Sequence, residues 1–211
     1  MIILIPLGGT GQRFKKKGYS LPKALIKING KEIIFHLIDN LKINNRISFI
    51  YIPYNSEYTK YDFENLLKRR YPNYKFKFMV LEEQTRGAAE TIYKALQKLY
   101  SNQIRYPINH TQMKEMFDKP ILCLDSDNFY TNDIIDLWNG ENIVFTFLSK
   151  DTNPIFSYLK TDDNENIIQI VEKQKISDKA CTGAYGFKSY YDLMDYCGYI
   201  INNNITQKGE F

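Results

Sequence analysis

The residues best suited to chemistry stand near the start of the chain, in the segment PLGGTGQRF at residues 6–14. Its glycines leave backbone N–H groups unshielded by Cβ atoms, so the main chain can curl around an anion and donate to it. Arg13 and the lysine of a later Pro-Lys pair, Lys23, add full positive charges. This combination favours a triphosphate ligand. We predict nucleotide-binding positions at Leu7, Gly8, Gly9, Thr10 and Gly11 and catalytic cations at Arg13 and Lys23.

Two common phosphate-binding motifs do not fit this spacing. A P-loop requires GxxxxGK[ST], and residues 8–14 contain no Gly-Lys pair. The dinucleotide motif GxGxxG, started at Gly9, would need a glycine where the chain has Phe14. A glycine-rich turn without a ligand remains open as the structural alternative.

The elements that must position these residues alternate between short apolar runs and longer segments of helical period. This alternation is typical of an α/β protein with a mostly parallel sheet covered on both faces. Strands are predicted at residues 1–7, 47–53, 75–81, 120–125 and 142–149, and amphipathic helices at 32–43, 58–71 and 88–100. Residues 156–161 and 167–171 flank a polar turn and predict a β-hairpin. The polar connection at 101–119 could form a flap.

Ligands in open α/β sheets bind beyond the carboxyl ends of the strands. The glycine loop follows the first predicted strand, and the acidic segment DSDN at residues 125–128 follows the fourth. We therefore expect these two segments, distant in sequence, to lie side by side.

Four segments, in this order, resemble elements of the sugar-phosphate nucleotidyltransferases. The first is PLGGTGQRF with its Pro-Lys pair, and the second is LEEQTRGAAETIYKAL at residues 81–96, similar to the base-recognition stretch. The third is ILCLDSDNFY at 121–130, similar to a strand that ends in Asp, and the fourth is IVEKQ at 170–174 with TGAYGFKS at 182–189, similar to the acceptor-binding elements. The resemblance implies a Rossmann-like three-layer sandwich with a mostly parallel mixed sheet and a small acceptor-side hairpin.

The resemblance also implies roles for individual residues. Gln84 and Gly87 would lie against the base, Asp127 would hold Mg²⁺, and Asp125 would bind on the nucleotide side as a second or outer ligand. The implied acceptor-binding residues are Glu172, Lys173, Thr182 and Gly183.

Several of these assignments have structural alternatives. Asp125 and Asp127 could instead cap a helix around residues 132–138, because carboxylates favour helix N-termini. Glu172 and Lys173 are adjacent, so in a regular strand they point to opposite faces and could act together only across a bulge or twist. Gln84 could be an exposed loop residue.

The activity implied is Mg²⁺-dependent transfer of NMP from an NTP, with CTP or UTP favoured, to a small phosphorylated acceptor, with release of pyrophosphate. A sugar phosphate is the favoured acceptor. A narrower resemblance is to cytidylyltransferases of bacterial capsule and surface-polysaccharide pathways, some of which accept phosphates other than hexoses. A catalytically inactive nucleotide-binding regulatory subunit on the same fold and a glycosyltransferase with an Asp-x-Asp motif remain as alternatives.

The chain departs from the family pattern at two places. Gln174 stands where the family usually has Pro after Glu-Lys, and residues 200–211 contain no counterpart of a second metal-binding Asp. We expect a single domain over residues 1–211, with a nucleotide-binding portion at 1–149 and an acceptor-binding portion at 150–211. Because the second Asp has no counterpart, we expect the acceptor-binding portion to be shortened at its C-terminus.

Composition narrows the class of partner. A chain of 211 residues that is 44% hydrophobic can bury one core, and a net charge of +4 gives no case for nucleic acid. No apolar run approaches the ~20 residues that span a membrane. Three cysteines without CxxC spacing argue against zinc and against a disulfide framework, which favours a reduced cytoplasmic location. The expected partners are an NTP and a small phosphorylated acceptor; the sequence leaves a homo-oligomer open.

Overall fold

The structure is a computed structural model that describes residues 1–102 and 109–206. The strands are β1 (Ile2–Leu4), β2 (Lys27–Ile28), β3 (Lys31–Glu32), β4 (Phe49–Asn55), β5 (Phe76–Leu81), β6 (Ile121–Leu124), β7 (Ile143–Leu148), β8 (Ser157–Thr161), β9 (Ile167–Glu172) and β10 (Lys179–Phe187). The α-helices are α1 (Gln12–Lys15), α2 (Ile33–Asp39), α3 (Phe63–Arg70), α4 (Ala88–Ser101), α5 (His110–Phe117), α6 (Ile134–Leu137) and α7 (Tyr190–Asn202). Two 3₁₀ helices are η1 (Lys23–Leu25) and η2 (Ser56–Tyr61).

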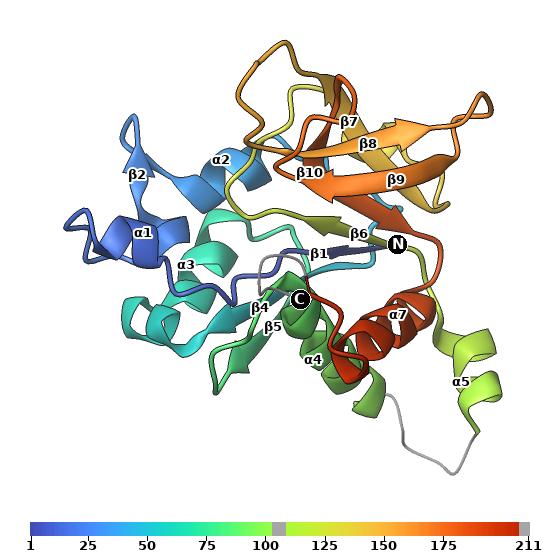
Figure 1. The fold of residues 1–211 in the computed structure, drawn as a ribbon. Coiled ribbons are helices and arrows are strands. Elements are labelled where there is room, and N and C mark those ends of the chain that lie inside the picture. Colours follow the sequence, from blue (N-terminus) through green and yellow to red (C-terminus); the bar gives the residue numbers. More distant parts are fainter. Residues whose placement is uncertain (103–108, 207–211) are drawn as a thin grey trace.

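The described residues form one eight-stranded mixed sheet of order β5-β4-β1-β6-β10-β8-β9, with β7 also paired to β10 (Figure 1). Strands β5, β4, β1 and β6 run parallel, whereas β10 runs antiparallel to β6, β7 and β8. The predicted α/β class with a mixed sheet is confirmed. The glycine loop and the segment after β6 both follow carboxyl ends of adjacent parallel strands, so they are neighbours as expected.

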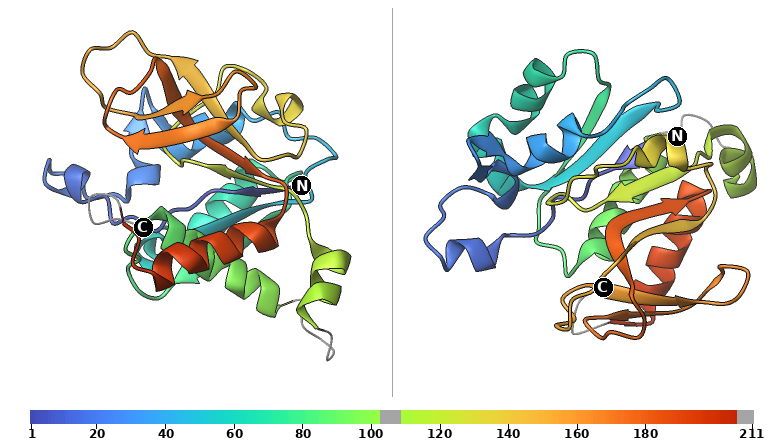
Figure 2. Two further views of the ribbon diagram at one scale, coloured as in Figure 1. Left: turned by 45° about the vertical axis from the view of Figure 1, so that its right-hand side comes forward. Right: turned by 90° about the horizontal axis from the view of Figure 1, so that it is seen from above.

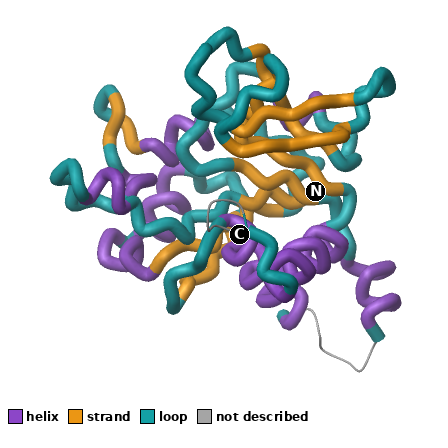
Figure 3. Tube along the Cα trace, in the orientation of Figure 1, coloured by secondary structure: helices purple, strands orange, loops and turns teal. Residues whose placement is uncertain are grey.

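Alternate residues of β1 and Ile5, which directly follows it, supply two cores, one on each face of the sheet. Ile3 and Ile5 pack into a core with α2, α3 and α6, whereas Ile2 and Leu4 pack into a second core with α4 and α7. These four side chains are almost completely buried, which is why the strand is apolar throughout rather than alternating. Figures 2 and 3 show α4 and α7 side by side along one face of the sheet.

Two predicted helices differ from the observed ones in their bounds. The helix predicted to end at residue 43 ends at Asp39, because the Asn40 side chain donates to the carbonyl of His36 (2.8 Å) and so takes one of the last helical acceptors. The helix predicted at 58–71 is divided by Asp62, whose φ of 50° is left-handed, into η2 and α3.

Parts of the polar connection at 101–119 and of the C-terminal end lie outside the described residues. Helix α5 occupies part of that connection, and residues 103–108 of the predicted flap lie outside the described residues. Residues 207–211, on which the expectation of a shortened C-terminus partly rests, also lie outside them.

The predicted hairpin is confirmed as β8 and β9, and its acceptor-side role stays a prediction. Asp162 closes its turn, since its carboxylate accepts from the N–H groups of Asn164 (3.0 Å) and Asn166 (2.7 Å). Strand β10 was not predicted as a sheet member, yet it joins this hairpin to β6 and so places β8 and β9 in the same sheet as β1, which the glycine loop follows.

Candidate active site

The glycine loop begins where β1 separates from its neighbour β4. Leu7 still bridges to Tyr54, and its N–H donates to the carbonyl of Pro53 (2.8 Å), so the residues after Leu7 are the first to leave the sheet. Gly11 has a φ of 65° and forms the N-terminal boundary of α1. Glycine suits that position because a left-handed conformation strains residues with a Cβ atom.

Gly8 brings this loop into contact with the segment predicted to read the base. A Cβ atom on Gly8 would lie 2.3 Å from Oγ1 of Thr91 and 2.8 Å from Oγ1 of Thr85. Those two hydroxyls are 2.6 Å apart, and Thr91 Oγ1 also donates to the carbonyl of Gly87 (3.1 Å). The loop and the predicted base-binding Gly87 are therefore joined through two buried threonines, while Gln84 is exposed beside them.

Lys23 connects the glycine loop to the acidic segment after β6. Its Nζ lies 2.5 Å from Oδ2 of Asp127, and its Cβ lies close to the loop, 3.5 Å from the position of a Cβ on Gly11. The hydroxyl of the buried Tyr58 accepts from the next backbone N–H, that of Ala24 (3.2 Å), and so helps to fix η1. Two predicted segments thus meet at one ion pair.

Arg13 lies in α1, is exposed, and forms no ion pair with any of the described residues. The neighbouring Lys15 is instead paired with Glu57 at 2.5 Å. Arg13 therefore remains a cation available to an anion bound at the loop.

Asp125 and Asp127 lie close enough to influence each other's charge. Solvent reaches the side chain of Asp125, but partial desolvation and the charge of Asp127 raise the pKa of Asp125 to about 6. Lys23 opposes this rise, and Glu172 adds to it. The alternative in which these aspartates cap the following helix is wrong, because Asp133 caps α6 by accepting from the N–H of Asp136 (3.1 Å).

Strand β10 holds the wall beside these carboxylates. The N–H of Asp125 donates to the carbonyl of Gly183 (2.8 Å), and Asn128 Nδ2 donates to the carbonyl of Thr182 (2.8 Å). Gly183 has a φ of 78°, and a Cβ there would lie 2.4 Å from Asp125 Oδ2. A side chain at that position would fill the space that Asp125 occupies.

The side chains of Glu172 and Lys173 contact each other although the two residues are adjacent in sequence. Strand β9 ends at Glu172, and Lys173 has a left-handed φ of 52°, which supplies the twist that the sequence required. Lys173 Nζ lies 2.9 Å from Glu172 Oε1, and Ser157 Oγ donates to Glu172 Oε2. Glu172 is thereby held at the edge of the same hollow as Asp125.

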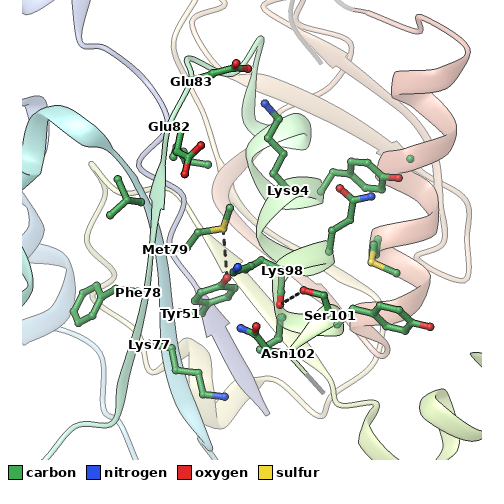
Figure 4. Close-up of a pocket in the computed structure, with 18 of the residues that line it drawn as sticks. Tyr51, Lys77, Phe78, Met79, Glu82, Glu83, Lys94, Lys98, Ser101 and Asn102 are labelled. Carbon is green, nitrogen blue, oxygen red and sulfur yellow. Dashed lines mark hydrogen bonds between the residues drawn. The ribbon is translucent and has the colours of Figure 1, made fainter. Parts of the chain in front are cut away.

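Two hollows of the described structure are large enough to hold a small ligand. The smaller, about 690 Å³, adjoins the Lys23–Asp127 pair and is lined by the predicted residues Asp125, Asp127, Glu172, Thr182 and Gly183. The larger, about 1520 Å³, lies between β5, α4 and α7, and none of the predicted site residues lines it (Figure 4). There Tyr51 donates to the carbonyl of Ala95 (3.1 Å), a contact that ties strand to helix. Because predicted site residues line the smaller hollow and none lines the larger, the smaller hollow is the candidate site.

The carboxylates of this site fit a magnesium ion better than a metal held by protein ligands alone. No group of three or more His, Cys, Asp or Glu side chains able to hold a metal occurs among residues 1–102 and 109–206. Asp125 and Asp127 offer two carboxylates whose mutual repulsion a divalent cation would relieve, and magnesium completes its octahedron with substrate phosphates and water.

Three residues whose contacts join segments of the candidate site were not identified from the sequence. They are Thr85, Thr91 and Asn128. Each stands inside a segment that resembles the family, but its role depends on what packs against it, so position alone could not have identified it.

The remaining expectations concern cysteines and membranes. Cys123, Cys181 and Cys197 are free and buried, and burial raises the pKa of Cys197 to about 12 and that of Cys181 to about 11. Thiols of this kind are poor metal ligands and nucleophiles. No helix within the described ranges has the length and apolar character needed to cross a membrane.

The chain belongs to the nucleotidyl transferase family, whose family model matches residues 2–199. Among curated proteins it is similar to the bifunctional protein GlmU of Methanococcus vannielii, with 28% identity over 174 residues. That alignment covers 82% of this chain and 35% of the relative, so the chain spans about a third of the curated protein it matches.

Solved structures show the same fold at low sequence identity. A nucleoside-diphosphate-sugar pyrophosphorylase from Vibrio cholerae RC9 aligns with a TM-score of 0.76 and 22% identity over 100% of this chain and 83% of its own. A UDP-glucose pyrophosphorylase complexed with UDP-glucose aligns with a TM-score of 0.65 and 16% identity over 93% and 78% of the two chains.

Proposed function

We propose that this protein transfers a nucleoside monophosphate from an NTP to a small phosphorylated acceptor of the sugar-phosphate type and releases pyrophosphate. The observation that carries the proposal is the 2.5 Å contact between Lys23 Nζ and Asp127 Oδ2. It joins a glycine loop suited to phosphates with a carboxylate suited to a metal, and it does so at the mouth of a hollow large enough for a small acceptor.

The reaction brings two polyanions together. An oxygen of the acceptor phosphate attacks the α-phosphorus, a new P–O bond forms, and the bond to the bridging oxygen of the β-phosphate breaks, so pyrophosphate leaves with that electron pair. At ~4 Å and an effective dielectric of ~20, each pair of like unit charges costs about 4 kcal/mol. Fixed positive charges that offset this repulsion, rather than a covalent nucleophile, are the main requirement.

Arg13, Lys23 and the loop amides supply that offset in this proposal. Lys23 would leave Asp127 for the triphosphate, and Asp127, with Asp125 beside it, would then hold Mg²⁺. A bound Mg²⁺ neutralises charge on the phosphates and helps to orient them. Gln84 and Gly87 would bind the base. CTP and UTP are the donors that we favour.

Acceptor binding is assigned to the far side of the hollow. Glu172 and Lys173 would contact the acceptor, and Thr182 and Gly183 would form the wall behind it. The same assignment divides the chain into a nucleotide-binding portion at 1–149 and an acceptor-binding portion at 150–211. The proposal also includes a location in the cytoplasm and a role in capsule or surface-polysaccharide synthesis.

Pyrophosphate release is the direct test. Four NTPs are incubated with a panel of sugar phosphates and other phosphorylated metabolites in the presence of Mg²⁺. Lys23→Ala should lower kcat/KM for the NTP strongly, whereas Lys17→Ala, which removes an exposed lysine from the same segment, should change it little. NTP binding without turnover of any acceptor would instead favour a regulatory subunit.

The role of Asp127 is tested by Asp127→Asn with Asp163→Asn as the control. Asp163 is an exposed carboxylate at the hairpin turn, remote from the ion pair. Loss of a metal ligand should remove several kcal/mol of transition-state stabilisation, so kcat should fall about a hundredfold or more in the first variant alone. Equal rates in the two variants at saturating Mg²⁺ would refute the assignment.

A further inference from the structure

Strand β5 forms an edge of the central sheet, remote from the candidate active site. Among the described strands it pairs with β4 alone, and it stands at one end of the strand order. The backbone N–H and C=O groups on its outer side therefore have no neighbouring strand, which is the condition under which a sheet takes up a further strand. Val80 in this strand is 38% exposed, so the edge also carries apolar surface.

The larger hollow opens beside this edge, and the proposed function makes no use of it. Met79 and Leu81 of β5 line it together with residues of α4 and α7, and its volume is about 1520 Å³. Figure 4 shows Lys77 at one end of the β5 segment and Glu82 and Glu83 at the other, with Met79 between them. The structure therefore leaves room beside β5 for the side chains of another strand.

The charged side chains at the two ends of β5 are opposite in sign. Lys77, Glu82 and Glu83 are exposed, and none of the three forms an ion pair with another residue in the ranges 1–102 and 109–206. Lys77 Nζ lies 4.0 Å from the centre of the Phe49 ring, and Lys94 of α4 lies toward the glutamate end in Figure 4. A surface that is positive at one end and negative at the other is complementary to itself after a half turn.

We propose that a second copy of this chain binds along β5, so that the two edge strands pair and join the two sheets. Identical strands related by a two-fold axis run antiparallel. The axis passes at Val80, which opposes the partner's Val80, and Lys77 then lies opposite the partner's Glu83. The pairing extends β5 through Glu82 and Glu83, which follow the strand as an exposed bend.

Charge and hydrophobicity together select this register. Opposed pairs alternate between two hydrogen-bonding types along an antiparallel ladder, so a two-fold axis must pass at a residue and not between two residues. With Val80 at the axis, Lys77 opposes the partner's Glu83 and Met79 opposes the partner's Leu81, all on the face toward the hollow. With Met79 at the axis, Lys77 would instead oppose the partner's Leu81, and Glu83 would oppose the partner's Lys75.

The oligomeric state of the purified protein tests the inference without any measurement of activity. Sedimentation velocity over a wide range of concentrations should show a dimer that weakens as the ionic strength rises, because symmetry-related ion pairs contribute to it. A monomer at every concentration would overturn the inference. A dimer that ignores ionic strength would also contradict it.

Charge reversal tests the register. Lys77→Glu and Glu83→Lys should each raise the dissociation constant of the homodimer about fivefold or more, because each variant opposes like charges at two places. An equimolar mixture of the two variants should dimerise as tightly as the wild type, since every opposed pair in the heterodimer again has opposite signs, and this recovery excludes misfolding as the cause of the single effects. Lys75→Glu is the matched control and should hardly change the dissociation constant. No effect of either reversal, no recovery in the mixture, or a stronger effect of Lys75→Glu than of Lys77→Glu would refute the proposed pairing.

A cysteine at the proposed axis gives an independent test. Directly opposed residues of antiparallel strands have Cα atoms about 4.5–5.5 Å apart, which is within the range of a disulfide. Val80→Cys should therefore form a covalent dimer on mild oxidation, whereas Ile168→Cys, in β9 at the opposite edge of the sheet, should not. The chain's own three cysteines are buried and should contribute little background. Absence of the Val80→Cys dimer, or equal cross-linking of the two variants, would overturn the inference.

Discussion

Gly8 and Gly9 are adjacent glycines in different surroundings, so the same substitution should affect stability at one position and nucleotide binding at the other. A Cβ on Gly8 would lie 2.3 Å from Thr91 Oγ1 and 2.8 Å from Thr85 Oγ1, whereas a Cβ on Gly9 would meet nothing within 4 Å. Neither glycine needs a left-handed backbone. Steric contact is therefore the difference between them.

The cost of Gly8→Ala can be estimated from the atoms that must move. Thr91 is 2% exposed and Thr85 is 9% exposed, and both are β-branched, so neither hydroxyl can rotate away freely. Overpacking of this kind costs about 1–3 kcal/mol, and separation of the buried hydroxyl pair adds to it. For a chain of this size each kcal/mol lowers Tm by about 2–4 °C, so overpacking alone should lower the Tm of Gly8→Ala by roughly 2–12 °C.

Thermal unfolding followed by circular dichroism measures this effect. Gly9→Ala should keep the wild-type Tm but should raise the KM for the NTP, because its new methyl group enters the space assigned to phosphate. In the double variant Gly8→Ala/Thr91→Ala, the nearest clash is absent, so it should be more stable than the sum of the single effects predicts, by about 1 kcal/mol. Equal Tm values for Gly8→Ala and Gly9→Ala would refute the packing argument.

Two further predictions use matched residues elsewhere in the chain. An alanine at position 183 would have to adopt a left-handed φ, and its Cβ would lie 2.4 Å from Asp125 Oδ2, so Gly183→Ala should lower both Tm and kcat. Gly30 also has a left-handed φ, of 79°, but a Cβ there would meet nothing within 4 Å, so Gly30→Ala should lower Tm alone. Equal kcat values in the two variants would count against a role for this wall. Partial burial acts to raise the pKa of Asp39, but hydrogen bonds from a tyrosine, a lysine and an arginine outweigh it and lower that pKa below 3.8. The contribution of Asp39 to stability is therefore present above pH 3.8 and is lost as the pH falls through the folded-state pKa. Because Asp39 is exposed and solvent screens these contacts, Asp39→Asn should reduce the free energy of unfolding by at most about 1 kcal/mol at neutral pH and progressively less in acid, while Asp163→Asn should show no such trend in urea titrations.

Local pattern was sufficient to predict the parts of the site that depend on single segments. The glycine loop, the acidic segment after β6 and the β8–β9 hairpin each carry their information in consecutive residues, and all three occur where the sequence placed them. The broken helix at Asp62 was missed because apolar spacing continues across it, while the break depends on one left-handed residue.

The contacts between segments could not be predicted in the same way. Helix α7 and the pairing of β10 with β6 depend on which distant surfaces remain to be covered, and no short-range pattern reports that. Thr85 and Thr91 illustrate the same limit, because their importance arises only when Gly8 packs against them. The roles assigned to individual site residues accordingly stay predictions until they are tested by substitution.

Strand β10 explains why a donor site and an acceptor site on this chain would act as one unit. Its carbonyls at Thr182 and Gly183 accept from Asn128 Nδ2 and from the Asp125 N–H, and the Thr182 hydroxyl donates to the carbonyl of Phe145 in β7 (3.0 Å). The strand to which we assign the acceptor wall therefore also fixes the carboxylates assigned to the metal. A change in this strand should alter carboxylate position as well as acceptor fit, so we expect substitutions in β10 to affect kcat and acceptor KM together.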